Sequence, residues 1–193
     1  LPIKKEQILD IRSTKTGARC YLCVTGGINV ENVMGAKTTH LTSGIGGIHG
    51  RILEKLDELD FGILDNSIKP VQNINNSITT DTRIIKVTKG IQWSWFNKNQ
   101  KNKLFQHQYQ VTDLSNRMGL RLSGNAINTK KENEITTAGI PLGSIQLPGD
   151  GQPIISFVEH QTTGGYPIIA NVISADIRKV GQLKPGDCFQ FEL

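Results

Sequence analysis

The sequence predicts an all-β protein, made mainly of strands with a few short helices. Residue usage favours strands, because 24 Ile and 16 Thr stand against 6 Ala in 193 residues, and β-branched residues favour strands whereas Ala favours helices. Short apolar segments recur at close spacing along the second half of the chain. Turn residues separate these segments and include many of the 20 Gly and 7 Pro, which is typical of a β-barrel or β-sandwich.

The first part of the chain predicts one hairpin, one helix and long connecting segments. Residues 6–13 alternate apolar and polar side chains, and a Thr-Gly turn separates them from the apolar residues 18–24, which indicates a β-hairpin. Residues 25–50 are rich in Gly and predict turns. Residues 52–59 carry apolar side chains at helical spacing, which predicts two helical turns. The Asn- and Ser-rich residues 63–82 are expected to form a surface loop or linker.

The second part of the chain predicts strands separated by turns and one short helix. Residues 81–88 have a strand pattern, and residues 93–106 predict a helix anchored by aromatic and leucine side chains. The further strands expected are residues 109–114, 119–123, 144–147, 153–158, 168–173 and 187–193.

Composition excludes several classes of protein. The chain is 37% hydrophobic and 20% charged without a long like-charge block, which argues against bulk disorder. No stretch approaches the ~18 consecutive apolar residues of a membrane span, so no membrane partner is expected. The net charge of +5 comes from mostly scattered basic residues, which together with the modest charge disfavours nucleic-acid binding, even though basic and aromatic residues alternate over residues 83–103.

The cysteines predict no metal site and no disulfide framework. Cys20, Cys23 and Cys188 are odd in number, so a complete set of internal disulfides is excluded. Cys20 and Cys23 lie in an expected strand, where positions three apart face opposite sides and are poorly placed to share a metal ion. We therefore expect a reduced, cytoplasmic location.

One glycine-rich loop is a candidate for anion binding. The segment SGIGGIHGR, residues 43–51, lets a ligand approach the backbone closely at Gly46 and Gly47, with His49 and Arg51 as polar ends. It lacks the spacing of dinucleotide- and nucleotide-phosphate-binding loops. The alternative is a tight turn between strands.

A second polar loop, residues 159–167 (EHQTTGGYP), follows an apolar strand. The side chains of Glu159 and His160 can transfer protons, and Gln161 and the threonine hydroxyls can bind an amide or a carboxylate. The alternative is a Gly-Gly turn with capping hydroxyls. The candidate catalytic residues are Glu159, His160 and Gln161, and the candidate binding residues here are Thr162, Thr163, Gly164, Gly165 and Tyr166.

Arg117, in the segment SNRMGLRL at residues 115–122, is a further candidate for binding an anion. The alternative is that the arginines of this segment are solvated residues flanking a strand.

Seven blocks, spread in order over nearly the whole chain, resemble one family. The most specific are GSIQLPGDGQP at residues 143–153 and QTTGGYP at residues 161–167. The chain is identified as a member of the family of 5-oxoprolinase C-type subunits, also called allophanate hydrolase subunit 2, whose members are biotin-dependent carboxyltransferase domain proteins. The other blocks are GGINV (26–30), SGIGGIHGR (43–51), SNRMGLRL (115–122), VISAD (172–176) and LKPGD (183–187).

The resemblance implies a cyclophilin-like β-barrel with two related half-domains. Family members begin with roughly 100 residues that have no counterpart here, so the first half-domain is expected to be incomplete. Residues 1–80 would be the remainder of the first carboxyltransferase-type subdomain, and residues 81–193 the C-terminal cyclophilin-like barrel subdomain. The resemblance also implies that residues 52–59 form a turn leading into a strand rather than a helix.

The resemblance further implies an activity and partners. In that family the C-type subunit acts with A- and B-type subunits to convert 5-oxoproline to glutamate at the expense of ATP, so a pocket for a small amide or anion is expected, completed by the B-type subunit. The fragment alone is expected to be inactive and to associate with itself or a partner. Two alternatives remain: a carboxyltransferase of a biotin-dependent urea carboxylase or allophanate hydrolase system, and a regulatory module that antagonises an inhibitor of a histidine kinase.

Overall fold

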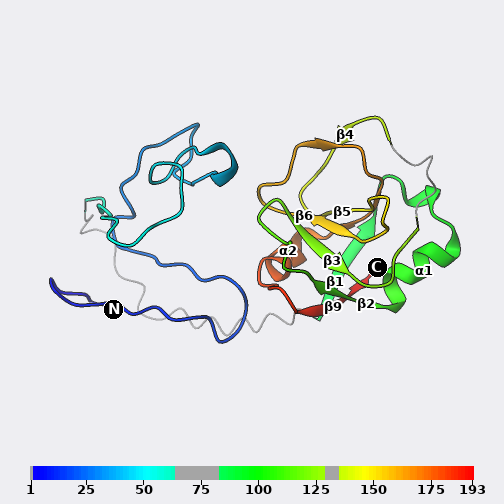
Figure 1. The fold of residues 1–193 in the computed structure, drawn as a ribbon, viewed down its shortest axis with the longest axis horizontal. Helices are drawn as coiled ribbons and strands as arrows, with labels where there is room; N and C mark the ends of the chain where they lie inside the picture. Colours follow the sequence, from blue (N-terminus) through cyan, green and yellow to red (C-terminus); the bar gives the residue numbers. More distant parts are fainter. Residues whose placement is uncertain (1, 64–82, 129–134) are drawn as a thin grey trace. The chain divides into compact units, whose positions relative to one another are not determined.

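The computed structural model describes residues 2–63, 83–128 and 135–193 (Figure 1). The chain divides into two compact units, one formed by Leu1–Cys20 with Thr79–Leu193 and the other by Tyr21–Ile78. Each unit is described by itself. The predicted boundary between residues 80 and 81 falls outside the described residues.

The first unit is a closed β-barrel with strand order β1-β8-β5-β6-β3-β2-β9 (Figure 1). Neighbouring strands are antiparallel except β1 and β9, which are parallel and close the barrel. The strands are β1 (Ile84–Lys89), β2 (Gln108–Val111), β3 (Gly119–Ser123), β5 (Ser144–Gln146), β6 (Ile154–Ser156), β8 (Ile168–Val172) and β9 (Cys188–Glu192).

The barrel interior is filled by the apolar side chains that alternate along these strands. Leu120 and Leu122 of β3 and Ile155 of β6 are almost completely buried, while their neighbours along each strand face outward. Aromatic rings fill the space near β9: the centroids of Tyr109 and Phe191 are 5.5 Å apart, and Phe189 meets Phe191 edge-on at 5.1 Å. The all-β barrel prediction is therefore confirmed.

Short helices accompany the strands. The helix predicted over residues 93–106 is divided into a 3₁₀ turn, η2 (Trp93–Trp95), and α1 (Lys98–Gln106). The division occurs because Asn97 begins a new helix: its Oδ1 accepts the Gln100 backbone N–H, and the Gln100 side chain accepts the Asn97 N–H in return. Helix α2 (Ser174–Val180) was not predicted from the sequence, and it packs against β1.

A two-stranded sheet lies beside the barrel and was also not predicted. It pairs β4 (Ala138–Gly139) with β7 (Thr163–Gly164). Each strand has only two residues, too few to produce a recognisable alternation.

The hairpin predicted over residues 6–24 is wrong, because no strand forms there. The Gln182 side chain instead accepts the backbone N–H groups of Ala18 and Arg19 at 3.1 and 3.2 Å. The Arg19 guanidinium lies 5.0 Å from the centroid of the Phe157 ring. These contacts use backbone groups that a hairpin would need, and an isolated two-stranded hairpin is at best marginally stable.

The second unit contains turns and single bridges rather than strands in its described residues, 21–63. Isolated bridges join Ile28 to Phe61, Val33 to Ala36 and His40 to Ile45, and a 3₁₀ turn, η1, spans Leu41–Ser43. The helix predicted over residues 52–59 is wrong. Leu56 adopts a left-handed φ of 78° within a turn, which is incompatible with a right-handed helix.

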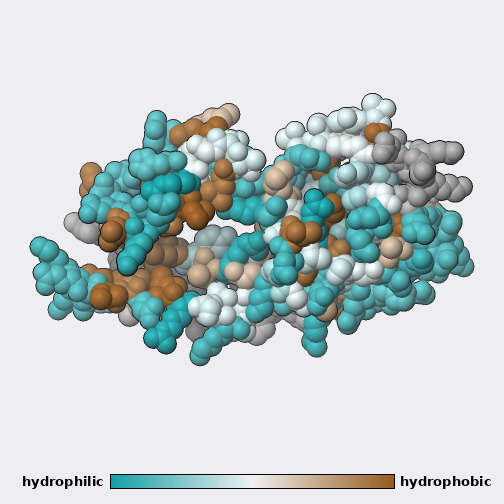
Figure 2. All heavy atoms as spheres, in the orientation of Figure 1, coloured by the Kyte–Doolittle hydropathy of each residue, from teal (hydrophilic) through white to brown (hydrophobic). Residues whose placement is uncertain are grey.

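Apolar side chains are exposed over much of residues 2–63, where Figure 2 shows many hydrophobic atoms at the surface. The most exposed are Ile8, Tyr21, Met34, Leu56 and Ile63. Among the helices of the described residues, none is long and apolar enough to cross a membrane.

Candidate functional site

Three neighbouring strands of the barrel, β3, β6 and β5, present polar side chains on their outer face. Strand register places Arg121 opposite Ile154 and Ile154 opposite Gln146, so these three residues form a row across the wall. In the next row Gly119 opposes Ser156. Because neighbouring strands lie about 4.8 Å apart, the backbones of Arg121 and Gln146 are separated by about 10 Å on one face.

A hollow of about 510 Å³ lies over this outer wall. The segment that follows β6 covers it and supplies four of the predicted site residues. The volume of the hollow falls in the usual range for small-molecule sites. The lining residues are Asn116, Met118, Gly119, Arg121, Gln146, Ile154, Ser156, His160, Gln161, Gly165 and Tyr166.

Gln146 is the most unusual residue of this hollow. Its side chain is 5% exposed, and its Nε2 donates to Ser156 Oγ at 2.8 Å. Its Oε1 is buried without a hydrogen-bond partner in the described part of the chain. A buried acceptor without a partner costs about 1–3 kcal/mol. A β-bulge between Ile145 and Gln146, opposite β8, directs this side chain.

His160 is held in one tautomer. Its Nδ1 lies 2.7 Å from the carbonyl oxygen of Gln161. A carbonyl oxygen only accepts, so Nδ1 carries the proton in the neutral ring and Nε2 is left as an acceptor. His160 can therefore take a proton at Nε2 from a molecule in the hollow.

Glu159 and Arg117 lie beside the hollow and bond to each other. Arg117 Nη2 is 2.7 Å from Glu159 Oε1, and the glutamate side chain is only 9% exposed. Neither residue lines the hollow. The pair joins the segment before β3 to the loop after β6, and so it holds in place the loop that carries His160 and Gln161.

The remaining residues of the predicted loop form the β7 side of the small sheet. Thr163 pairs with Gly139 and Gly164 with Ala138. The Thr162 carbonyl accepts the Ile140 N–H, and the Gly165 carbonyl accepts the Ile135 N–H. The loop thus has sheet bonding that fixes Gly165 and Tyr166 at the hollow.

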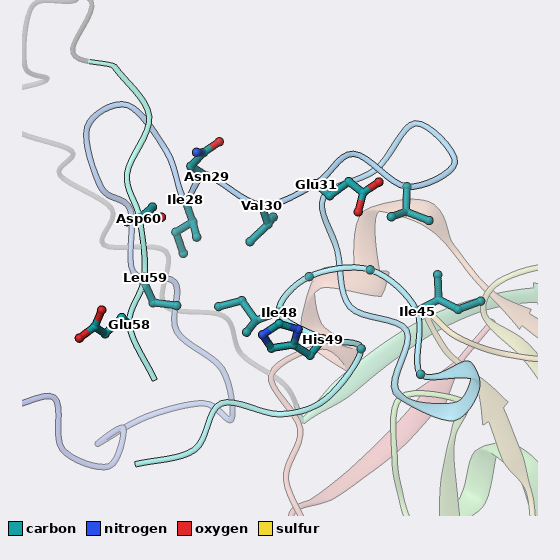
Figure 3. Close-up of a pocket in the computed structure, with 15 residues that line it drawn as sticks. Ile28, Asn29, Val30, Glu31, Ile45, Ile48, His49, Glu58, Leu59 and Asp60 are labelled. Atoms are coloured by element: carbon teal, nitrogen blue, oxygen red, sulfur yellow. The ribbon is translucent and has the colours of Figure 1, made fainter. Parts of the chain in front are cut away.

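A second hollow, of about 800 Å³, lies within the second unit (Figure 3). Predicted residues Gly46, Gly47 and His49 line it, together with parts of residues 28–33 and 58–60. Figure 3 shows Val30, Ile48 and Leu59 around this space. His49 has a left-handed φ of 54°, and a Cβ at Gly50 would meet the Gly44 carbonyl oxygen at 1.9 Å, so the loop requires glycine there.

Arg51 does not line this second hollow, and its guanidinium is hydrogen-bonded to the carboxylate of Asp57. Its two Nη atoms bond Asp57 at 2.8 and 2.7 Å. The hydrogen bonds from Arg51, together with one from the Glu54 backbone N–H, hold the pKa of Asp57 well below its usual range. The same pair raises the pKa of Arg51.

The predicted site residues therefore fall in both units. The first unit brings together His160, Gln161, Gly165 and Tyr166, and the second carries Gly46, Gly47 and His49. Sequence reasoning missed Gln146, Ser156 and Arg121, although the specific GSIQLP block contains Gln146. Over residues 2–63, 83–128 and 135–193, no group of three or more His, Cys, Asp or Glu side chains is placed to hold a metal ion.

The protein is a closed β-barrel with a polar hollow on its outer wall. Comparison with known protein families shows which family has this domain. The chain belongs to the carboxyltransferase domain family: the family described as carboxyltransferase domain, subdomain A and B, matches residues 1–193. Membership of this family was predicted from the sequence blocks and is confirmed.

Individual relatives define the nearer resemblance. The chain is 35% identical to the 5-oxoprolinase C subunit of Escherichia coli over 191 residues, which are 99% of this chain and 61% of that protein. It is 32% identical to urea amidolyase of Saccharomyces cerevisiae over 98% of this chain and 11% of that protein. The crystal structure of Kluyveromyces lactis urea carboxylase superposes with a TM-score of 0.77 at 28% identity, covering 92% of this chain and 18% of that chain. The chain thus spans 61% of the length of the E. coli relative.

Proposed function

We propose that this chain is the C-terminal part of a C-type subunit of an ATP-dependent 5-oxoprolinase, which converts 5-oxoproline to L-glutamate. The observation that carries the proposal is the 35% identity to the E. coli 5-oxoprolinase C subunit over 99% of the chain. The chemistry of the barrel hollow supports it, since amide, hydroxyl and imidazole groups suit a small amide. ATP would act at the level of the complex formed with A- and B-type subunits.

In this proposal the hollow binds the lactam while His160 and Gln161 act on it. Gln161 orients the amide, and Nε2 of His160, left free because Nδ1 bonds the Gln161 carbonyl, accepts a proton from the water that attacks the amide carbonyl and returns it to the ring nitrogen as the C–N bond breaks. The loop of Gly46, Gly47 and His49 is a second binding element, completed by the B-type subunit. Glu159 and Arg117 position the loop rather than contact the substrate.

The test is ATP-dependent release of glutamate from 5-oxoproline by the full-length protein co-expressed with A- and B-type subunits. Gln161→Ala should lower kcat/KM at least tenfold, because one hydrogen bond to the reacting amide is lost. Gln110→Ala, on the exposed side of β2, is the matched control and should leave turnover unchanged. Wild-type turnover by Gln161→Ala would contradict the assignment of this hollow.

A second candidate is a carboxyltransferase of a biotin-dependent urea carboxylase system. It is supported by the 32% identity to S. cerevisiae urea amidolyase and by the fold shared with K. lactis urea carboxylase. The biotin would then be attached to another chain. Turnover of urea with bicarbonate and ATP, together with a biotinylated partner detected by avidin blotting, would favour this candidate over the first.

A further inference from the structure

Two glutamine side chains that line the hollow, Gln146 and Gln161, approach the same point beside Gly164. A Cβ built on Gly164 would lie 2.5 Å from Ile140 Cδ1, 2.8 Å from Gln161 Nε2 and 3.5 Å from Gln146 Oε1. The two groups do not bond each other, since Gln146 Oε1 has no partner among the described residues. A glutamine donor and a glutamine acceptor therefore lie near the same point beside Gly164, with the Ile140 side chain as their apolar neighbour.

This arrangement matches one edge of a cis amide. In a lactam or a cyclic urea the N–H and C=O groups lie on the same side of the C–N bond, whereas a trans peptide directs them to opposite sides. An N–H donates to Gln146 Oε1 while the adjacent carbonyl accepts from Gln161 Nε2. The bond from Gln146 Nε2 to Ser156 Oγ fixes the acceptor before the ligand arrives.

The hollow also has an unneutralised charge. Arg121 lines it, and in the described residues its guanidinium bonds to no carboxylate, unlike those of Arg51 and Arg117. No Asp or Glu is among the described lining residues. A planar guanidinium with free donors binds a carboxylate through two parallel hydrogen bonds.

We propose that Gln146 and Gln161 recognise the cis-amide edge of a small cyclic amide and that Arg121 binds the carboxylate of the same molecule. The proposal rests on the proposed function for the choice of 5-oxoproline as first ligand. It adds two residues to the proposed function. Gln146 accepts the N–H of the ligand and so favours an amide over an ester, and Arg121 favours ligands that carry a carboxylate. The row Arg121–Ile154–Gln146 places the two groups on one face of the barrel wall.

The test is ligand binding by calorimetry to the full-length protein, with three probes. These are 5-oxoproline, its lactone analogue 5-oxotetrahydrofuran-2-carboxylate, which lacks the N–H, and 2-pyrrolidinone, which lacks the carboxylate. Wild-type protein should bind 5-oxoproline about tenfold more tightly than the lactone. It should bind 2-pyrrolidinone roughly 10- to 100-fold more weakly than 5-oxoproline.

Two variants should each remove one of these preferences, the preference for the lactam over the lactone or the preference for a ligand with a carboxylate. Gln146→Met keeps the side-chain length and should bind lactam and lactone equally, while Arg121→Gln should bind 5-oxoproline and 2-pyrrolidinone equally. Gln110→Met on β2 and Arg178→Gln on α2 line no part of the hollow and should keep both preferences. A lactam preference that persists in Gln146→Met, or a carboxylate preference that persists in Arg121→Gln, overturns the corresponding assignment.

A pair of glycine variants tests whether the ligand binds at the point beside Gly164 that both glutamines approach, without altering either glutamine. Gly164→Ala places a methyl group 2.5 Å from Ile140 Cδ1 and 2.8 Å from Gln161 Nε2, so it displaces these side chains and should weaken 5-oxoproline binding at least tenfold. Gly139→Ala, in the same two-stranded sheet, meets no atom within 4 Å and should bind as wild type does. Equal binding by the two variants would overturn this placement of the ligand.

The outcomes separate this inference from the proposed function. Selective, Gln146-dependent binding of cyclic amides without turnover by the complex would support the recognition pair and refute the 5-oxoprolinase assignment. Turnover of 5-oxoproline with no difference between Gln146→Met and wild type would support the assignment and refute the pair.

Discussion

Three arginines of the candidate segments have different environments in the structure. Arg51 is bonded to Asp57 and Arg117 to Glu159, whereas Arg121 faces the barrel hollow. The sequence favoured Arg51 and Arg117 as anion-binding residues. Glu159, which bonds Arg117, is remote from it in the chain, so only the fold can tell which guanidinium is available to a ligand.

Arg117→Ala should destabilise the barrel unit by about 1–2 kcal/mol, because it leaves the nearly buried Glu159 carboxylate without its cation. Equilibrium unfolding in urea measures the change. Arg178→Ala, an exposed arginine of α2, provides the comparison and should alter stability by less than about 0.5 kcal/mol. If Arg117→Ala kept wild-type stability but lost ligand binding, Arg117 would be a ligand contact rather than a positioning residue.

The Arg51–Asp57 pair should make the second unit sensitive to acid. The pKa of Asp57 is lowered in the folded chain, so its stabilising effect is present above the unfolded pKa of about 3.9 and is lost as the pH falls below that value. The protection of the amides of residues 51–57 against hydrogen exchange, measured relative to the intrinsic exchange rate at each pH, should fall between about pH 5 and pH 2.5. Asp57→Asn should show the lower protection at about pH 5 already, and an acid-induced loss of protection retained in that variant would contradict the role of this pair.

At the scale of elements, strands that line the barrel interior were predictable and elements set by remote contacts were not. Strand β3 was predicted at its observed bounds, because Leu120 and Leu122 alternate with outward residues. The 6–24 hairpin failed because Gln182, at the other end of the chain, bonds the backbone that would have paired.

The same distinction applies to the candidate site. The polar loop 159–167 was recognisable by composition, and His160 and Gln161 do line the hollow. Gln146 and Ser156 occupy outward positions of their strands, where a polar residue normally faces water. Their burial depends on the segment after β6 covering the wall, and no local pattern encodes that covering.

The stability of helix α1 should depend on Asn97, the residue that caps its N-terminus. Asn97→Ala removes the side-chain acceptor of the Gln100 backbone N–H, while the bond from the residue-97 backbone N–H to the Gln100 side chain is kept, and should destabilise the barrel unit by about 1 kcal/mol. Asn102→Ala, exposed inside the same helix, should be neutral or slightly stabilising, since Ala has the higher helix propensity. Thermal unfolding of the two variants gives the comparison, and equal midpoints would show that the cap does not stabilise the helix.

At the scale of the whole molecule, the apolar surface of residues 2–63 should promote association. Ile8, Met34 and Leu56 are each at least 89% exposed, and apolar side chains left in water are stabilised by burial against another molecule. We expect the chain to elute in light-scattering chromatography above its monomer mass of 21.3 kDa.

Polar replacement should reverse that association. The double variant Met34→Gln with Leu56→Asn should shift the population toward monomer, and Asn tolerates the left-handed conformation at position 56. Leu114→Gln, which removes one exposed leucine of the barrel unit, should not shift it. A monomeric wild-type chain would show that the exposed apolar residues do not drive self-association.

The parallel pairing of β9 with β1 has a consequence for how the protein is made. Strand β9 completes the barrel, since it pairs with β1 on one side and with β2 on the other. A ribosome produces β1 and β2 long before Cys188–Glu192. The edges of β1 and β2 that pair with β9 therefore stay unpaired until translation has passed that segment. The nascent chain therefore exposes two unpaired strand edges from the emergence of β2 until that of β9, and chaperones that shield such edges should bind it over this interval.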